Sequence, residues 1–180
     1  MSRLTDSGKR KVNSIDFAPI FEFRNTTSRG ALQTWRERLR ETGKTLVFTN
    51  GVFDLLHAGH ASYLREARNA GDALIIGLNS DASVRAIKGP NRPIQKEADR
   101  ALVLSSLKCT DAVVIFEEET PLEILRFLLP DILIKGADYS KETIVGADVV
   151  EANGGQVLTI PLSEGRSTSG IVERILERYK

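Results

Sequence analysis

The chain contains two histidines, His57 and His60, which stand three residues apart directly after an apolar segment. Residues at this spacing share one face of a helical turn, so both imidazoles can reach one ligand. The first turn of a helix also carries free backbone N–H groups that favour anions. The pair therefore suits phosphate oxygens that gain charge in a transition state. Half of a metal site with Asp54, and two ordinary surface histidines, are the alternatives at this point.

A second candidate for anion binding is the turn Gly165-Arg166-Ser167-Thr168-Ser169, which opens an amphipathic helical pattern. Hydroxyl side chains at a helix start are caps by default, and the free amides beside them can also hold phosphate. The turn alone favours a cap. Its occurrence together with the histidine pair favours phosphate binding by its three hydroxyl residues.

Four basic side chains stand where anions are expected. Lys88 and Arg92 lie in a turn-rich segment, Lys135 follows an apolar segment, and Arg100 lies early in the next helical pattern. Most basic residues only solubilise a surface. These positions, however, favour neutralisation of anionic charge by Lys88 and binding of an anionic substrate by Arg92 and Arg100. Asp54 is expected beside the same substrate, where it would orient its own loop or a histidine.

These residues require a framework, and the apolar pattern predicts one. Continuous apolar runs of strand length alternate with helical patterns, which indicates an α/β fold of about five parallel strands covered by helices on both faces. Ligands of such sheets bind beyond the carboxyl ends of the strands. The expected strands are residues 45–49, 73–79, 111–116, 131–134 and 156–160, and the expected helices are 31–41, 60–70, 94–107, 121–129 and 168–179.

Composition restricts the class of protein. The 180 residues are 41% hydrophobic and 27% charged, with a net charge of +1, which fits one globular domain without bulk attraction to nucleic acid or membrane. We expect an N-terminal extension over residues 1–28, in part disordered, and a domain over 29–180. Cys109 is the single cysteine, so no disulfide framework is expected. No membrane span or secretory signal is evident, which favours the cytoplasm.

The pattern Gly51-x-Phe53-Asp54-x-x-His57-x-Gly59-His60 resembles the signature of the cytidylyltransferase-like nucleotidyltransferase superfamily. The resemblance implies a Rossmann-like fold in which both histidines stabilise the α-phosphorus transition state. It implies Mg²⁺ accompanying the nucleotide, without a dedicated metal site. The nucleotide-binding residues that it implies are Thr49, Asn50, Gly51, Phe53, Gly59, Lys135, Gly136, Asp138, Ser167, Thr168 and Ser169.

Further segments are similar to the adenylyltransferases that act on D-glycero-β-D-manno-heptose 1-phosphate, namely residues 79–83, 116–121, 133–139 and 152–155. This narrower resemblance implies ATP and a sugar 1-phosphate as substrates, and a role in lipopolysaccharide synthesis. It also implies a stand-alone enzyme, because the 44 residues before Thr45 cannot contain a kinase domain. A homodimer is a further expectation, since dimers are common among relatives.

Two other functions remain open from the sequence. One is a cytidylyltransferase acting on a polyol or alcohol phosphate, because base choice cannot be read from these motifs. The other is a non-catalytic nucleotide-binding module, because a fold does not determine a function.

Overall fold

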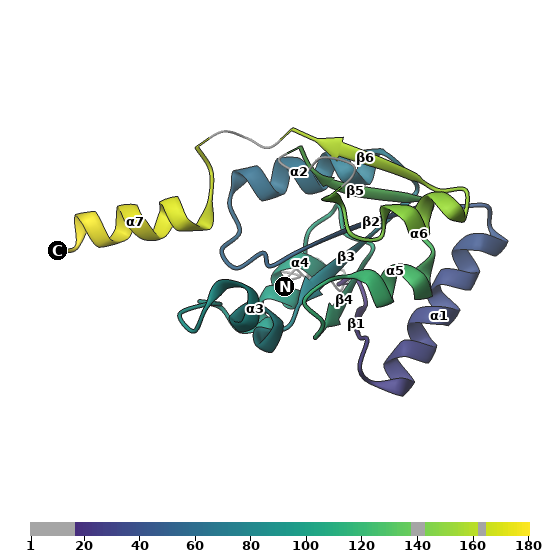
Figure 1. The fold of residues 1–180 in the computed structure, drawn as a ribbon, viewed down its shortest axis with the longest axis horizontal. Helices are drawn as coiled ribbons and strands as arrows, with labels where there is room; N and C mark the ends of the chain where they lie inside the picture. Colours follow the sequence, from purple (N-terminus) through teal and green to yellow (C-terminus); the bar gives the residue numbers. More distant parts are fainter. Residues whose placement is uncertain (1–16, 138–142, 162–164) are drawn as a thin grey trace, which may run out of the picture.

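Six parallel strands form one sheet in the described part of the chain, in the order β1-β4-β3-β2-β5-β6 (Figure 1). The structure is a computed structural model that describes residues 17–137, 143–161 and 165–180. The strands are β1 (Ile20–Glu22), β2 (Leu46–Gly51), β3 (Ala73–Asn79), β4 (Ala112–Phe116), β5 (Ile132–Gly136) and β6 (Gln156–Ile160). The helices are α1 (Thr26–Glu41), α2 (Ala58–Asn69), α3 (Asp81–Lys88), α4 (Glu97–Ser105), α5 (Leu122–Leu128), α6 (Ala147–Ala152) and α7 (Thr168–Arg178).

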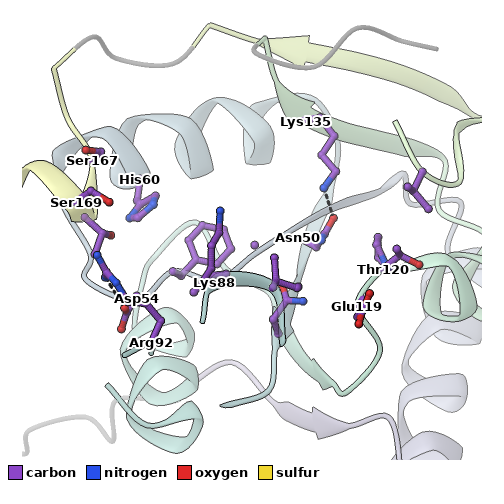
Figure 2. Close-up of a pocket in the computed structure, with 18 of the residues that line it drawn as sticks. Asn50, Asp54, His60, Lys88, Arg92, Glu119, Thr120, Lys135, Ser167 and Ser169 are labelled. Carbon is purple, nitrogen blue, oxygen red and sulfur yellow. Dashed lines mark hydrogen bonds and ion pairs between the residues drawn. The ribbon is translucent and has the colours of Figure 1, made fainter. Parts of the chain in front are cut away.

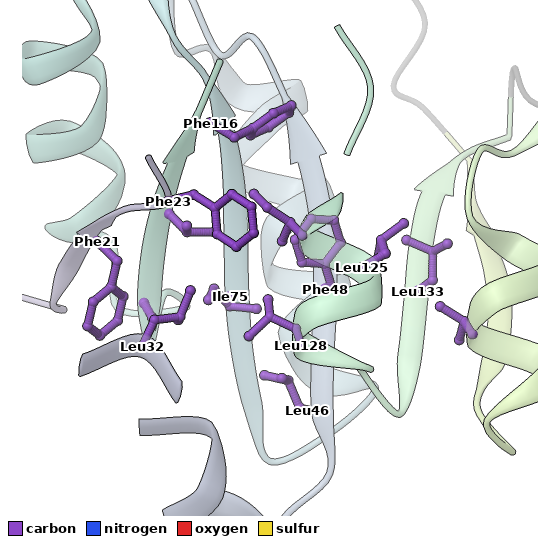
Figure 3. Packing of buried hydrophobic residues seen from close by; sticks show 14 of the residues in the cluster. Phe21, Phe23, Leu32, Leu46, Phe48, Ile75, Phe116, Leu125, Leu128 and Leu133 are labelled. Atoms are coloured by element: carbon purple, nitrogen blue, oxygen red, sulfur yellow. The ribbon is translucent and has the colours of Figure 1, made fainter. Parts of the chain in front are cut away.

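Helices cover both faces of the sheet, which confirms the predicted α/β class. One face packs against α1, α5 and α6 in a cluster that contains Leu32, Phe48, Leu125 and Val150 (Figure 3). The opposite face packs against α2 and α4, with Leu64 among the buried residues. Every residue of β3 and β4 is buried, which explains why these strands read as unbroken apolar runs.

The sheet begins earlier in the chain than predicted. β1 lies within the segment expected to be an N-terminal extension, and it pairs with β4 as a sixth, edge strand. Phe21 and Phe23 on either side of Glu22 are buried in the core. The predicted boundary after residue 28 falls inside α1. A strand of three residues is too short to show a period in the sequence, so its assignment depends on pairing with β4.

The chain reverses its direction of travel across the sheet between β2 and β5. It passes from β2 through β3 to β4, and then returns to place β5 on the other side of β2. The carboxyl ends of β2 and β5 therefore flank a topological switch point, where ligands of such sheets bind. α7 projects away from the body of the molecule (Figure 1), and no residue of it is buried. None of the described helices has the combination of length and apolar character needed to cross a bilayer.

Candidate active site

A cavity of about 580 Å³ lies at this switch point, beyond the carboxyl ends of the central strands (Figure 2). Its wall comes from the ends of β2, β3 and β5 and the segments that follow them, together with the segment after β4, and the start of α7 closes one side. The residues that line it are Asn50, Gly51, Val52, Phe53, Asp54, His60, Asn79, Ile87, Lys88, Arg92, Glu119, Thr120, Pro121, Lys135, Thr143, Ile144, Val145, Ser167, Thr168 and Ser169.

The two histidines form one unit at the start of α2. His57 is the N-cap of the helix, and its Nδ1 accepts a hydrogen bond from the backbone N–H of His60 at 3.4 Å. The two rings stack with their centroids 3.9 Å apart. The rings of Phe53 and His60 make an edge-to-face contact with their centroids 5.2 Å apart. His60 lines the main cavity, whereas His57 lines a smaller neighbouring cavity beside Arg166.

Glycines permit this close packing. A Cβ on Gly59 would lie 3.0 Å from the His57 ring, and a Cβ on Gly51 would lie 3.1 Å from the ring of Phe53. The space above Gly59 is therefore filled by His57, and Gly59 does not line the cavity, although the resemblance placed it among the nucleotide-binding residues. Phe53 itself has a φ of 45°, which is uncommon for an aromatic residue and turns its ring back over Gly51.

Both imidazoles are neutral at pH 7. Burial of the ring, followed by the charge of His57, lowers the pKa of His60 to about 4. Burial and the positive charge of Arg166 also lower the pKa of His57. A neutral imidazole still carries one N–H, so each ring can donate a hydrogen bond to a phosphate oxygen. Bound phosphate would add negative charge nearby and raise both pKa values.

We expect the stability of the protein to fall as the pH drops from about 6.5 to 4. The unfolded chain binds a proton at His60 near its ordinary pKa of 6.5, whereas the folded chain resists protonation down to about 4. Protonation therefore favours the unfolded chain across this window. Urea unfolding at pH 7 and pH 4.5 measures the effect, and His60→Asn should lose less stability between these values than the parent. Equal losses in the two proteins would contradict the assignment.

Asp54 fixes the loop that carries Arg92. Its carboxylate is buried and accepts hydrogen bonds from Arg92 at 2.7 Å and from the backbone N–H groups of Ile94 at 2.7 Å and Gln95 at 3.0 Å. Burial alone raises the pKa of this carboxyl, but the bonds from Gln95, Arg92 and Ile94 outweigh it and hold the pKa below its usual range. Asp54 therefore acts as the orienter of a loop, one of the two roles expected for it.

Arg100 lies outside the cavity, contrary to its predicted contact with an anionic substrate. The residue is 1% exposed. Its guanidinium donates to the carbonyl of Val52 at 2.7 Å, to the carbonyl of Gln95 at 3.0 Å and to Asp81 at 2.7 Å. With three protein acceptors occupied and no access to the cavity, its role is to hold the loops after β2 and before α4 together.

The predicted lysines line the cavity. Lys88 is the last residue of α3, a helix that the apolar pattern did not reveal. Lys135 lies near the end of β5, and its Nζ donates to Asn50 Oδ1 at 2.5 Å across the switch point. The two cations and Arg92 bring positive charge to a cavity that also contains the amide of Asn50. Such a cavity favours an anionic ligand.

The turn before α7 closes the opposite side of the cavity. Ser167 is the N-cap of the helix and accepts a hydrogen bond from the N–H of Gly170 at 3.0 Å. Thr168 Oγ1 donates to the carbonyl of Leu55 at 3.5 Å, which links the turn to the loop before the histidines. Ser167, Thr168 and Ser169 all line the cavity. The cap interpretation and the phosphate interpretation are therefore compatible in this geometry.

Three other predicted nucleotide contacts require comment. Thr49 is fully buried and its hydroxyl is hydrogen-bonded to Tyr63 at 2.7 Å, so it faces the core. Gly136 is buried in β5 and does not line the cavity. Asp138 lies outside the described residues. The sequence also left several lining residues unassigned. Asn79 could have been found because it ends a predicted strand, and Glu119 and Thr120 because they lie in residues 116–121, one of the segments similar to the adenylyltransferases. Thr143 and Val145 carried no comparable signal.

Residues 48–169 match the cytidylyltransferase-like family. The match covers more than half of the chain and includes both histidines and the turn before α7. The chain therefore belongs to the cytidylyltransferase-like family and is a nucleotidyltransferase.

Two similar curated proteins make the relationship more specific. The bifunctional protein HldE of Syntrophotalea carbinolica is 57% identical over 152 residues, which are 84% of this chain and 31% of that protein. The bifunctional protein HldE of Pelobacter propionicus is 49% identical over 168 residues, which are 93% of this chain and 34% of that protein. The chain thus spans about a third of the length of these relatives.

Solved structures agree on the fold. A lipopolysaccharide core biosynthesis protein from Thermoplasma volcanium superposes with a TM-score of 0.57 at 28% identity, covering 69% of this chain and all of that chain. A pantoate-β-alanine ligase from Francisella tularensis gives a TM-score of 0.58 at 15% identity, covering 84% of this chain and 69% of that chain. The second likeness shows the fold alone, and together they confirm the predicted Rossmann-like nucleotidyltransferase architecture.

Proposed function

We propose that this domain transfers AMP from ATP to D-glycero-β-D-manno-heptose 1-phosphate, giving ADP-heptose and pyrophosphate for lipopolysaccharide core synthesis. The observation that supports a transfer to phosphate is the position of His60, Lys88 and the Ser167 turn around one cavity at the switch point. The similarity to two HldE proteins supports the adenine and the heptose. A reaction that consumes ATP supports the cytoplasm as its location.

The proposed reaction is an in-line displacement at the α-phosphorus of ATP. An oxygen of the sugar phosphate forms a bond to this phosphorus, the bond to the α,β-bridging oxygen breaks, and pyrophosphate leaves. The attacking oxygen is already anionic at pH 7, so alignment and charge stabilisation are sufficient without a strong general base.

Each group of residues has a proposed part in this reaction. His57 and His60 would donate N–H groups to the α- and β-phosphate oxygens as negative charge grows there. Ser167, Thr168 and the free amides of α7 would hold the β- and γ-phosphates. Lys88 would neutralise charge at the reacting phosphates, and Arg92, fixed by Asp54, would neutralise charge on the triphosphate or the sugar phosphate.

Magnesium is proposed to enter as part of the ATP substrate. Within the described residues, no group of three His, Cys, Asp or Glu side chains could hold a metal ion. The oxygens of Asp54 are occupied by three donors. Mg²⁺ suits this arrangement, because it binds phosphate oxygens and retains several of its waters. On the triphosphate it would neutralise charge.

Pyrophosphate release tests the proposed function. The purified protein is assayed with ATP or CTP, each combined with the heptose 1-phosphate or with glycerol 3-phosphate. We expect release only with ATP and the heptose 1-phosphate. Turnover of CTP with glycerol 3-phosphate would replace the proposal by a cytidylyltransferase. Tight ATP binding without any pyrophosphate release would indicate a non-catalytic nucleotide-binding module.

We also propose that the protein forms a homodimer. Support comes from α7, which exposes apolar side chains that a second copy would cover. Ile175 is 50% exposed and Leu176 is 56% exposed. Light scattering coupled to size exclusion measures the mass in solution, and a double change of these residues to glutamate should give a monomer. A monomeric parent protein would refute this proposal.

A further inference from the structure

Three consecutive glutamates follow β4, and each of them has different surroundings in the structure. Glu117 forms an ion pair with Arg24. The carbonyl of Glu118 accepts a hydrogen bond from Ser83 Oγ at 2.8 Å, and Ser83 Oγ in turn accepts from the side chain of Asn79 at 2.9 Å. These bonds fix the segment against the end of β3. Of the three glutamates, only Glu119 lines the cavity.

The charge of Glu119 is opposite to that of the surrounding wall. Asp54 and Glu119 are the two carboxylates that line the cavity within the described residues. Asp54 is satisfied by Arg92 and two backbone amides. Glu119 takes part in none of the ion pairs found among the described residues. An ionised carboxylate repels phosphate and accepts hydrogen bonds from neutral hydroxyl groups. Glu119 therefore suits a part of the ligand that is rich in hydroxyl groups.

In-line geometry decides which hydroxyl groups these are. The attacking and leaving oxygens must lie on opposite sides of the α-phosphorus. Pyrophosphate would leave toward the turn with Ser167 and Ser169, so the acceptor enters from the opposite side. Figure 2 shows Glu119 and Thr120 across the cavity from that turn, with Lys88 drawn between them. This position matches the sugar of the acceptor, which is attached to the attacking oxygen. The ribose of ATP is attached to neither the attacking nor the leaving oxygen, so it lies off this line.

We propose that Glu119, with the hydroxyl of Thr120 beside it, binds hydroxyl groups of the sugar 1-phosphate and selects a polyhydroxylated acceptor. The inference rests on the proposed function, because it takes the direction of pyrophosphate departure from it. Glu119 is a specificity residue that contacts the acceptor and has no part in charge stabilisation at the phosphorus.

The test compares Glu119→Gln with the matched control Glu118→Gln, whose side chain is exposed and lies outside the cavity wall. Loss of a hydrogen bond to a charged group should raise KM for the sugar 1-phosphate roughly 10-fold to 100-fold in Glu119→Gln. KM for ATP should stay within about 2-fold of the parent value, and Glu118→Gln should match the parent in both constants. Calorimetric titration with the sugar 1-phosphate and with inorganic phosphate provides a readout without turnover. Only binding of the sugar ester should weaken.

The outcomes separate this inference from the proposed function. A parent protein that binds the sugar 1-phosphate but releases no pyrophosphate contradicts the proposed function, while weakened binding by Glu119→Gln still supports the assignment of Glu119. An active parent with an unaffected Glu119→Gln overturns the assignment alone. A rise in KM for ATP also overturns it, because the carboxylate would then face the nucleotide. A parent that does not bind the sugar ester overturns both.

Discussion

Replacing His60 by alanine is expected to lower kcat by about two to four orders of magnitude, the cost of removing a preorganised donor from a developing charge. Its ring is held between two others, because it stacks on the ring of His57 and makes an edge-to-face contact with the ring of Phe53. The backbone N–H of His60 in turn donates to Nδ1 of His57 and fixes that ring. Such a donor requires no reorganisation when charge develops on the phosphate. Turnover measured as ADP-sugar formation at saturating ATP gives the value.

The expected pattern separates a catalytic role from a structural one. KM for ATP should change much less than kcat, because the N–H of His60 is proposed to strengthen its bond as the transition state forms. His57→Ala should also reduce kcat, and in addition it removes the cap of α2, so its unfolding free energy must be measured in parallel. Near-normal turnover in both variants would refute the proposed mechanism.

Replacing Arg100 by methionine is expected to destabilise the fold by about 3–5 kcal/mol, the range found when one partner of a buried ion pair is removed. The side chain of Arg100 is fully buried, and its loss leaves the carbonyls of Val52 and Gln95 and the carboxylate of Asp81 without their donor. Urea denaturation monitored by circular dichroism measures the change in unfolding free energy.

Arg126→Met is the matched control for this experiment. Arg126 also pairs with a carboxylate, that of Glu123, at 2.7 Å, but both side chains are more than half exposed. Exposed pairs of this kind contribute about 0–1 kcal/mol, so the control should unfold close to the parent. Equal stability of the two variants would show that the buried network around Arg100 does not hold the fold together.

Patterns local in the chain were sufficient to predict much of this protein. The alternation of apolar runs and helical patterns predicted a parallel sheet covered on both faces, and the strand-end rule located the cavity. The spacing of His57 and His60 and the cap at Ser167 are also local features, because a helix start is determined within a few residues. The sequence pattern thus predicted the two helix starts that line the cavity, at His60 and at Ser167.

Other features depend on contacts between distant segments, and only the tertiary structure decided them. The three residues of β1 become a strand because β4 offers an open edge. Arg100 and Arg92 stand close together in the sequence and share a side-chain type. Arg100 is nevertheless buried and bonded to the carbonyl of Val52, whereas Arg92 lines the cavity. Asp54 finds its partners about forty residues away. Polar side chains choose between solvent, ligand and a buried partner according to the surroundings that the folded chain brings to them, and periodicity does not encode that choice.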